Sequence, residues 1–335
     1  MTPLLEVKNL KVRFNTIAGI VKAVDDVSYR IDEGDVVGLV GESGCGKSVS
    51  QMAITQLIPT PPGEITGGEV IFEGQDLLKF APDSKQIRAI RGGKIGMIFQ
   101  EPMTSFNPVF NIGDQLIESI SLHLKLNKQS AREYAIKLLE QVGISDAKVR
   151  INHYPHQFSG GMRQRAMIAM AVSCHPKLVI ADEPTTALDV TTQAQVLEVM
   201  MDMVTSYHTS LVIVTHNLGI VARYAQKILV MYAGRIVESG TSDDVFNDPR
   251  HPYTIALLKS VPRLDEPRGR QLTPIFGIPP NLIDMPPICT FKPRCKFAQN
   301  NICEINPDLR QVGDYHFVRC QLDIKGESSG IYLGK

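Results

Sequence analysis

The segment Gly41-Glu-Ser-Gly-Cys-Gly-Lys-Ser48 fits the pattern G-x-x-x-x-G-K-[ST] and follows the apolar run Asp35-Val-Val-Gly-Leu-Val40. In this pattern, glycines let backbone N–H groups face the phosphates, the lysine reaches the β- and γ-phosphates, and the hydroxyl binds Mg²⁺. The alternative is a glycine-rich turn without a ligand. Because an apolar strand precedes the pattern and a helix can follow it, we expect a phosphate loop that binds a nucleoside triphosphate.

The apolar patterns indicate an α/β fold with an added antiparallel layer. Short alternating runs at Leu5–Phe14 and Val24–Ile31 predict half-buried antiparallel strands. The runs Lys94–Phe99, Leu178–Ala181 and Leu211–Thr215 are more continuously apolar, which is typical of a sheet covered on both faces. We therefore predict a mixed central sheet beside an antiparallel sheet.

A helical insertion is expected within residues 101–157, and a helical subdomain over about 101–175. Ser130-Ala-Arg-Glu133 resembles a capping box that opens a helix through about Val142, with Ile136, Leu138 and Leu139 on its apolar face. After about residue 241, frequent prolines break long regular elements. We predict a nucleotide-binding domain at 1–245 and a partly irregular C-terminal domain at 246–335.

The charge balance excludes a global attraction to nucleic acid or anionic lipid. The 335 residues include 35 Lys plus Arg and 35 Asp plus Glu, which gives a net charge of zero. Charges interrupt the early apolar stretch, so we expect no secretory signal. No span reaches the roughly 20 apolar residues that cross a bilayer. We expect a cytosolic chain that meets a membrane only through partners.

Two further segments carry candidate chemistry. The strand Lys177-Leu-Val-Ile-Ala ends in Asp182 and Glu183, of which the first can hold Mg²⁺ and the second can orient the attacking water. Phe158-Ser-Gly-Gly-Met-Arg-Gln-Arg165 places a serine cap and two glycines before a helix, which suits a phosphate. The alternatives are a strand that ends in an acidic turn and an ordinary capped helix.

The order of these motifs resembles the nucleotide-binding subunit of ABC transporters across residues 4 to about 245. The residues that carry the resemblance are the phosphate loop, Gln100, Ser159-Gly-Gly161, Asp182-Glu183, Ala187-Leu-Asp189 and His216. In that family two subunits enclose two ATP molecules, and each phosphate loop faces the Ser-Gly-Gly segment of the other subunit. The resemblance thus implies an ATPase that needs a second subunit.

The resemblance also implies roles for individual residues. Phe14 stacks on adenine, Gln100 senses the metal and the transporter, Asp189 crosses the dimer interface and His216 contacts the γ-phosphate. A buried core histidine at the end of a strand is the alternative for His216. The implied catalytic residues are Glu183, His216, Gln100 and Lys47; the implied magnesium residues are Ser48, Gln100 and Asp182. The expected nucleotide contacts are Phe14, Gly41, Glu42, Ser43, Gly44, Cys45, Gly46, Lys47, Ser48, Val49, Ser159, Gly160, Gly161 and Asp189.

Two positions depart from the commonest family pattern. Phe158 begins the signature segment, and Met162 stands where a glutamine is usual. Neither change alters the Ser159 hydroxyl or the glycine amides, so phosphate recognition is expected to survive. Phe14 can stack but cannot donate an O–H bond.

Four of the six cysteines lie near the C-terminus, at positions 289, 295, 303 and 320. Disulfides are disfavoured in the cytosol, so these thiols bind a metal or stay free. No pair has the two-to-four-residue spacing of structural zinc sites, whereas iron–sulfur ligation tolerates wider spacing. From the residues alone, an iron–sulfur cluster, zinc and free thiols all remain open.

Arg250-His-Pro-Tyr-Thr254 and Cys289-Thr-Phe-Lys-Pro-Arg-Cys295 are similar to the C-terminal region of dipeptide and oligopeptide importer ATPases. Some members of that family carry a four-iron, four-sulfur (4Fe-4S) cluster there. The resemblance implies Cys289, Cys295, Cys303 and Cys320 as its ligands. Cys45 and Cys174 are expected to be non-ligands.

The resemblance implies a subunit that powers peptide import from the cytoplasmic face of the membrane. Its expected partners are two permease subunits, a second and different ATPase subunit and, indirectly, an external peptide-binding protein. The permease surface is expected within residues 101–157, and Asn107–Asp114 are its proposed coupling segment. Nickel or glutathione as cargo, a soluble ABC protein acting on nucleic acid and a small-molecule kinase are the alternatives. Zero net charge, a single nucleotide-binding core and the absence of a coiled-coil insertion argue against nucleic acid.

Overall fold

The computed structural model describes residues 3–101, 105–186, 188–260, 274–283 and 285–326. Its contacts divide the chain into two compact units. The first unit comprises residues 1–31, 35–78 and 214–335, and the second comprises residues 32–34 and 79–213. These contacts do not separate residues 246–335 from the rest of the first unit. The domain boundary predicted between residues 245 and 246 therefore stays a prediction.

An antiparallel sheet in the first unit has the strand order β2-β1-β4-β5. Leu5 in β1 lies opposite Ile31 in β2 and Phe72 in β4, so three apolar side chains meet on the buried face. This pairing agrees with the alternation that the sequence showed in the first two strands. The strands are β1 (Leu5–Thr16), β2 (Gly19–Ile31), β4 (Gly63–Phe72) and β5 (Gln75–Asp76).

A second set of strands in the first unit runs in the order β11-β12-β10-β9-β3. Strands β3 and β9 are parallel, and β10 pairs with β9 and β12 in antiparallel fashion. All five residues of β3 are buried, as its continuous apolar sequence predicts. The elements are β3 (Val36–Val40), β9 (Lys227–Tyr232), β10 (Arg235–Thr241), β11 (Arg310–Gln311), β12 (Phe317–Val318), α1 (Lys47–Ile54), α9 (Leu218–Tyr224), α10 (Ser242–Asn247), α11 (Pro252–Lys259) and the 3₁₀ turn η3 (Lys292–Arg294).

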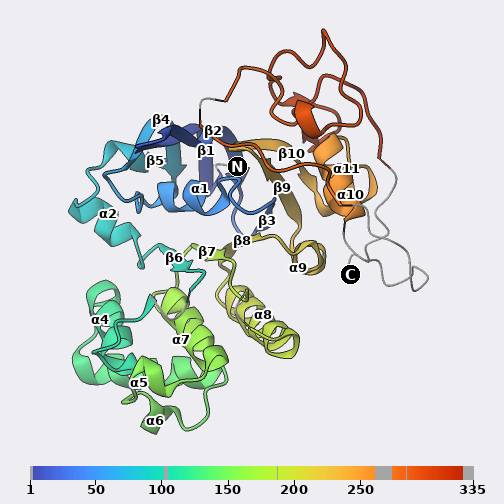
Figure 1. The fold of residues 1–335 in the computed structure, drawn as a ribbon. Coiled ribbons are helices and arrows are strands. Elements are labelled where there is room, and N and C mark those ends of the chain that lie inside the picture. Colours follow the sequence, from blue (N-terminus) through green and yellow to red (C-terminus); the bar gives the residue numbers. More distant parts are fainter. Residues whose placement is uncertain (1–2, 102–104, 187, 261–273, 284, 327–335) are drawn as a thin grey trace. The chain divides into compact units, whose positions relative to one another are not determined.

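The second unit combines the parallel pair β6–β7, flanked by β8, with a group of helices. Figure 1 shows α4, α5, α6 and α7 gathered together. Helices α4, α5 and α6 lie within residues 101–157, where the sequence predicted helical structure. The elements are α2 (Lys85–Ile90), β6 (Ile95–Ile98), α4 (Ile112–Leu124), α5 (Lys128–Gln141), α6 (Ala147–Arg150), η2 (Pro155–Gln157), α7 (Gly160–Val172), β7 (Leu178–Asp182), α8 (Val190–Ser206) and β8 (Ser210–Thr215), with η1 (Leu77–Lys79) before them.

The predicted start of helix α5 is wrong. The sequence placed a capping box at Ser130, but the helix begins at Lys128 and Asn127 is its N-cap. The Asn127 side chain accepts a hydrogen bond from the backbone N–H of Ser130 at 2.9 Å. Asparagine caps a helix as well as serine does, so the earlier of two competing caps is the one used.

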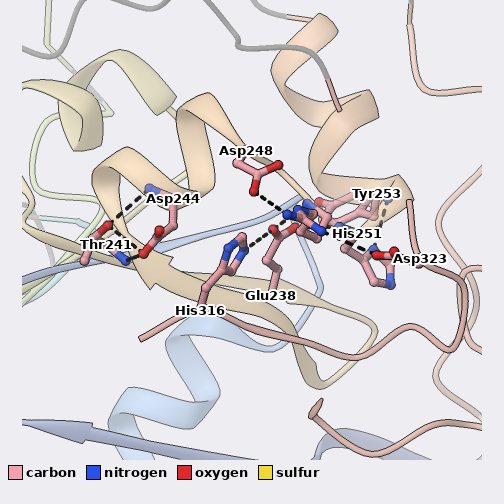
Figure 2. Close-up of polar contacts among 9 residues, drawn as sticks. Glu238, Thr241, Asp244, Asp248, His251, Tyr253, His316 and Asp323 are labelled. Atoms are coloured by element: carbon pink, nitrogen blue, oxygen red, sulfur yellow. Dashed lines mark hydrogen bonds and ion pairs between the residues drawn. The ribbon is translucent and has the colours of Figure 1, made fainter. Parts of the chain in front are cut away.

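The C-terminal region is attached to β10 through a buried carboxylate, which Figure 2 shows. Glu238 is fully buried and accepts hydrogen bonds from the backbone N–H groups of Arg250 and His251 at 2.7 and 2.8 Å. His316 Nε2 lies 2.7 Å from Glu238 Oε1, the oxygen that also accepts from the Arg250 N–H, whereas the His251 N–H donates to Oε2. One glutamate therefore joins β10, the start of α11 and the segment that leads into β12.

A capping box orders the turn that follows β10 (Figure 2). The Thr241 hydroxyl accepts from the backbone N–H of Asp244, and the Asp244 carboxylate accepts in return from the backbone N–H of Thr241. Helix α11 begins with Pro252, a residue that suits the first helical position because its missing N–H has no helical partner there. Among the described helices, none combines the length and hydrophobicity that a membrane span requires.

Candidate nucleotide-binding site

The predicted phosphate loop joins β3 to α1 in the first unit. Gly41 and Gly46 allow the loop to pack directly on neighbouring backbone. A Cβ atom at Gly41 would lie 2.2 Å from the carbonyl oxygen of Met231, and one at Gly46 would lie 2.1 Å from that of Ala23. Gly46 also has a left-handed φ of 102° at the N-cap of α1. Both positions therefore require glycine for reasons of space.

Lys47 is held inside this loop. Its side chain is buried, and Nζ donates to the carbonyl oxygens of Gly41 at 2.8 Å and Glu42 at 3.0 Å. Ser43 and Gly44 are exposed at the turn, while Ser48 and Val49 are half-buried in the first turn of the helix. The loop thus presents its central backbone outward and keeps the ammonium group behind it.

Cys45 is the buried cysteine of the loop. Burial raises the pKa of its thiol, so the sulfur stays protonated near neutral pH. Cys174, which follows α7, is also buried, and its sulfur lies near Ser119 and Ser173. Both cysteines are packed residues distant in sequence from the C-terminal four.

Phe14 and His216 also belong to the first unit. Phe14 lies on β1, is half-buried and stands opposite Val21 and Gly63 in the antiparallel sheet. His216 directly follows β8 and is exposed. The alternative of a buried core histidine is therefore excluded for His216.

Two acidic residues end β7 in the second unit. Asp182 is 5% exposed, and Glu183 follows it with a left-handed φ of 45°. Such a φ is uncommon for a residue other than glycine and occurs often at functional sites. This backbone conformation at Glu183 ends the extended strand β7 directly after Asp182.

Gln100 and Glu183 meet within the second unit, a contact that the sequence did not reveal. Gln100 Nε2 donates to Glu183 Oε2 at 3.2 Å, and the Thr186 hydroxyl donates to the same oxygen at 3.0 Å. Thr186 was not among the predicted site residues. Its position three residues after the glutamate, in the turn Pro184-Thr-Thr186, is the only sequence signal that could have suggested it.

The predicted serine cap of the second anion segment is confirmed. Ser159 is the N-cap of α7, and its hydroxyl accepts from the backbone N–H of Met162 at 3.3 Å. Gly160 and Gly161 form the first turn of that helix instead of preceding it, and a Cβ atom at Gly161 would lie 2.8 Å from a Thr192 methyl group. The helix N-terminus therefore carries small residues where a phosphate could approach.

Asp189, which the sequence resemblance placed at the dimer interface, is the N-cap of α8 in the structure. Its carboxylate is exposed and accepts from the backbone N–H of Thr192 at 3.0 Å, and this bond lowers the pKa of the carboxyl group. Ala187, which formed part of the predicted motif, lies outside the described residues.

The predicted iron–sulfur ligand set is not supported by the structure. Among the residues that the structure describes, which include all four cysteines, no group of three or more His, Cys, Asp or Glu side chains is arranged to hold a metal ion. Two of the cysteine positions nevertheless meet through their backbones, since the Cys289 N–H donates to the Cys303 carbonyl at 3.4 Å. Burial is the largest cause that raises the pKa of Cys295 to about 11. Cys289 and Cys295 are half-buried, and Cys303 and Cys320 are buried.

Comparison with known proteins places the chain in a family. Residues 24–186 match the family described as ABC transporter, and residues 237–303 match the oligopeptide/dipeptide transporter C-terminal region. The oligopeptide transport ATP-binding protein OppD of Bacillus subtilis (strain 168) is 49% identical over 96% of this chain and 89% of that protein. The chain belongs to the ATP-binding subunits of peptide ABC transporters.

Other members of this peptide-transporter family are similarly close. The dipeptide transport ATP-binding protein DppD of Bacillus subtilis (strain 168) is 47% identical and covers 100% of this chain and 99% of its own length. A solved dimeric structure of the ATP-binding cassette MJ0796, in a post-hydrolysis state with ADP and Pi, has a TM-score of 0.63 at 25% identity. It covers 71% of this chain and 98% of its own. The fold is that of an ABC transporter ATPase cassette.

Proposed function

We propose that this chain hydrolyses ATP to drive the import of dipeptides or oligopeptides through a membrane ABC transporter. The observation that carries the proposal is the continuity of the similarity, which includes both the cassette and the C-terminal region of named peptide transport subunits. A cassette alone would indicate an ABC ATPase without a cargo class. Nickel and glutathione remain the competing cargoes.

For the ATP site, we propose that the phosphate-loop amides and Lys47 bind the phosphates and that Phe14 stacks on adenine. Glu183 would orient water, with Gln100 and Thr186 fixing its carboxylate, and His216 would stabilise the transferred charge. Mg²⁺ prefers hard oxygen ligands, which Ser48, Asp182 and Gln100 can supply as hydroxyl, carboxylate and amide oxygens. When bound, the ion neutralises charge that develops on the phosphates.

For the assembly, we propose a pair of ATPase subunits at the cytoplasmic face of the membrane. The dimer of MJ0796 with ADP and Pi supports such a pair. Ser159, Gly160 and Gly161 of one subunit would serve ATP on its partner, with Asp189 at the interface. The second subunit would be a different ATPase, and the pair would act on two permease subunits. An extracytoplasmic peptide-binding protein would deliver the peptide to these permeases.

The central test is Glu183→Gln in the complete transporter. We expect ATP binding to persist while hydrolysis falls at least a hundredfold, because removal of a general base costs about 10²–10⁴-fold. Uptake of a labelled dipeptide should fall with hydrolysis. Glu140→Gln, an exposed change on α5, is the matched control. Undiminished hydrolysis in Glu183→Gln would refute the assigned role, and uptake of nickel or glutathione without peptide uptake would refute the cargo.

For the permease contact, we propose the start of α4 and the residues before it. Val109 is 71% exposed and Phe110 is 52% exposed, so two apolar side chains are available there. Deleting Asn107–Asp114 would also remove the Asn111 cap of α4, because Asn111 accepts from the backbone N–H of Asp114 at 2.7 Å. Substitution of the exposed pair is therefore the cleaner test.

Serine at both Val109 and Phe110 should reduce peptide uptake while ATP binding stays at the wild-type level. Leu122→Ser is the control, because Leu122 is 69% exposed at the other end of the same helix. Normal uptake by the double variant would remove this segment from the coupling surface.

A 4Fe-4S cluster at the four C-terminal cysteines is a second proposal, which rests on the resemblance of their spacing to iron–sulfur ligands and on the backbone hydrogen bond that joins Cys289 to Cys303. When bound, the cluster would stabilise a loop-rich segment by metal ligation. Iron, sulfide and zinc should be measured in anaerobically purified protein, with Cys303→Ser as the comparison. About four irons and four sulfides per chain would support the cluster, whereas zinc or metal-free protein after reconstitution would contradict it.

A further inference from the structure

The second residue of the phosphate loop is bound by the C-terminal region. Arg294 Nη1 donates to Glu42 Oε2 at 2.6 Å, and Nη2 donates to Oε1 at 3.0 Å. This bidentate arrangement is the strongest geometry available to an arginine and a carboxylate. Glu42 and Arg294 are 252 positions apart and both belong to the first unit.

The backbone of Glu42 is also bound by a residue of the C-terminal region. Its N–H donates to the Tyr253 hydroxyl oxygen at 2.8 Å. Tyr253 is fully buried, and burial raises the pKa of its hydroxyl group, which therefore stays protonated and uncharged. A neutral hydroxyl that accepts this bond is not displaced by changes of pH in the working range.

The contact between Tyr253 and Glu42 affects Lys47 because both residues hydrogen-bond to the same peptide unit, between Gly41 and Glu42. The Glu42 N–H and the Gly41 carbonyl belong to the same planar trans peptide unit and point in opposite directions. Tyr253 accepts from the N–H at one side, while the carbonyl at the other side accepts from Lys47 Nζ at 2.8 Å. The orientation that Tyr253 imposes on this peptide therefore also positions the acceptor that holds Lys47.

Arg294 is itself rigidly placed. Nε donates to the Phe276 carbonyl at 2.9 Å, and the remaining donors reach the Gly277 carbonyl and the Tyr232 hydroxyl, each at 3.3 Å. The residue is 8% exposed, and its guanidinium carbon lies 5.8 Å from the centre of the Tyr232 ring. Every N–H of the guanidinium group thus has an acceptor.

Tyr253 and Tyr232, which hydrogen-bond to Glu42 and Arg294, belong to an aromatic cluster. The rings of Tyr232 and Tyr253 have centroids 4.6 Å apart, and Phe291 meets them edge-on at 5.2 and 5.5 Å. Phe291 and Arg294 both lie between the first two C-terminal cysteines. The segment that carries those cysteines is therefore packed into the support of the phosphate loop.

We propose that Arg294 and Tyr253 are positioning residues for the phosphate loop, through which the C-terminal region sets nucleotide affinity. This inference rests on ATP binding by the loop. The C-terminal region is then part of the nucleotide site's support, beyond any role in recognising a transporter. Loss of either contact frees the peptide that orients Lys47 and weakens binding of the phosphates.

The test is equilibrium binding of a fluorescent ATP analogue with Mg²⁺ to the full-length chain. Arg294→Gln and Glu42→Gln, which remove charge-assisted hydrogen bonds, should each weaken binding about tenfold or more. Tyr253→Phe removes one neutral hydrogen bond and should weaken binding about fivefold. Arg294→Gln combined with Glu42→Gln should be no weaker than the worse single variant, because both remove the same fork.

The direction of the Glu42→Gln effect separates positioning from simple charge. If Arg294 only neutralised a carboxylate near the phosphates, Glu42→Gln would leave an extra cation and tighten binding. Positioning predicts weaker binding instead. It also predicts that Arg294→Lys fails to restore affinity, because an ammonium group keeps the charge but not the planar fork.

Lys292→Gln is the matched control, because Lys292 pairs with Glu304 and lies two residues before Arg294. It should bind like wild type. Thermal unfolding without nucleotide identifies variants that fail to fold, and Tyr253→Phe, which removes one oxygen atom, decides the outcome if Arg294→Gln does not fold. Wild-type affinity in Tyr253→Phe, or tighter binding in Glu42→Gln, overturns the proposal. Failure of the wild-type chain to bind the analogue would instead refute the ATP site.

Discussion

Removal of the Glu238 carboxylate should loosen the C-terminal region more than any change on its surface. Glu238→Ala deletes the acceptor of the Arg250 and His251 backbone N–H groups and the partner of His316 (Figure 2). The site has no exposed surface at Glu238, and His316 is 3% exposed. The three groups left behind would therefore have little access to water unless the region opens.

The magnitude follows from these bonds. A hydrogen bond to a charged group contributes about 1.5–3 kcal/mol, but relaxation and water entry make three such values non-additive. A buried donor left without its acceptor costs about 1–3 kcal/mol, so with partial relaxation we expect a total of about 3–5 kcal/mol for Glu238→Ala. Glu238→Gln keeps the volume and an oxygen acceptor, so its cost should be only about 1–2 kcal/mol.

Amide hydrogen exchange in α11 measures this loss locally. Because about 1.4 kcal/mol is a factor of ten, exchange in Glu238→Ala should accelerate by roughly two to four powers of ten, and by less in Glu238→Gln. Glu304→Ala removes an exposed partner of Lys292 and should change exchange by less than about fivefold. If α11 in Glu238→Ala exchanges at the rate of that control, the carboxylate does not anchor the region.

Two further predictions concern helix caps. The neutral His251 ring accepts from the backbone N–H of Tyr253 at 3.0 Å, and burial lowers the pKa of His251 to about 3. In the unfolded chain His251 takes up a proton near pH 6.5, whereas the folded chain keeps the ring neutral. As pH falls from 6.5 toward 3, the unfolding free energy of the wild type should therefore drop by about 1.4 kcal/mol per pH unit relative to His251→Asn, which caps the helix without titrating. A constant difference in unfolding free energy between the two proteins from pH 7 to 5 would contradict this. Asn127→Ala should destabilise α5 by about 1 kcal/mol and Ser130→Ala by much less, as measured by hydrogen exchange, and the reverse order would restore the capping box at Ser130.

The sequence was informative where function depends on neighbouring residues. The phosphate loop needs glycines at fixed spacing, and the buried strands need continuous apolar runs, so both could be predicted. Ser159 could be identified as a cap because its partner N–H lies three residues later. Asn127 was missed for a related reason: two nearby caps competed, and the serine had the more familiar pattern.

Contacts between distant segments could not be predicted in the same way. Nothing in the neighbourhood of Glu42 indicates that its carboxylate pairs with Arg294, because the fold alone brings them together. The same holds for Glu238, because the sequence pattern of β10 gives no sign that this carboxylate is fully buried. The C-terminal cysteines are the reverse case, because residues that cluster in the sequence do not form a metal-holding group of side chains among the described residues.

The short pairing of β12 with β10 has a consequence for solubility. Glu238 and Ser239 lie opposite Val318 and Phe317, so β12 pairs with the middle of the seven-residue strand β10. A chain cut at residue 245 would expose this strand as a free edge, which can pair with another molecule. The outermost strand that replaces it, β11, has only two residues and offers little template for such pairing. We therefore expect removal of the C-terminal region to make the cassette more prone to aggregation.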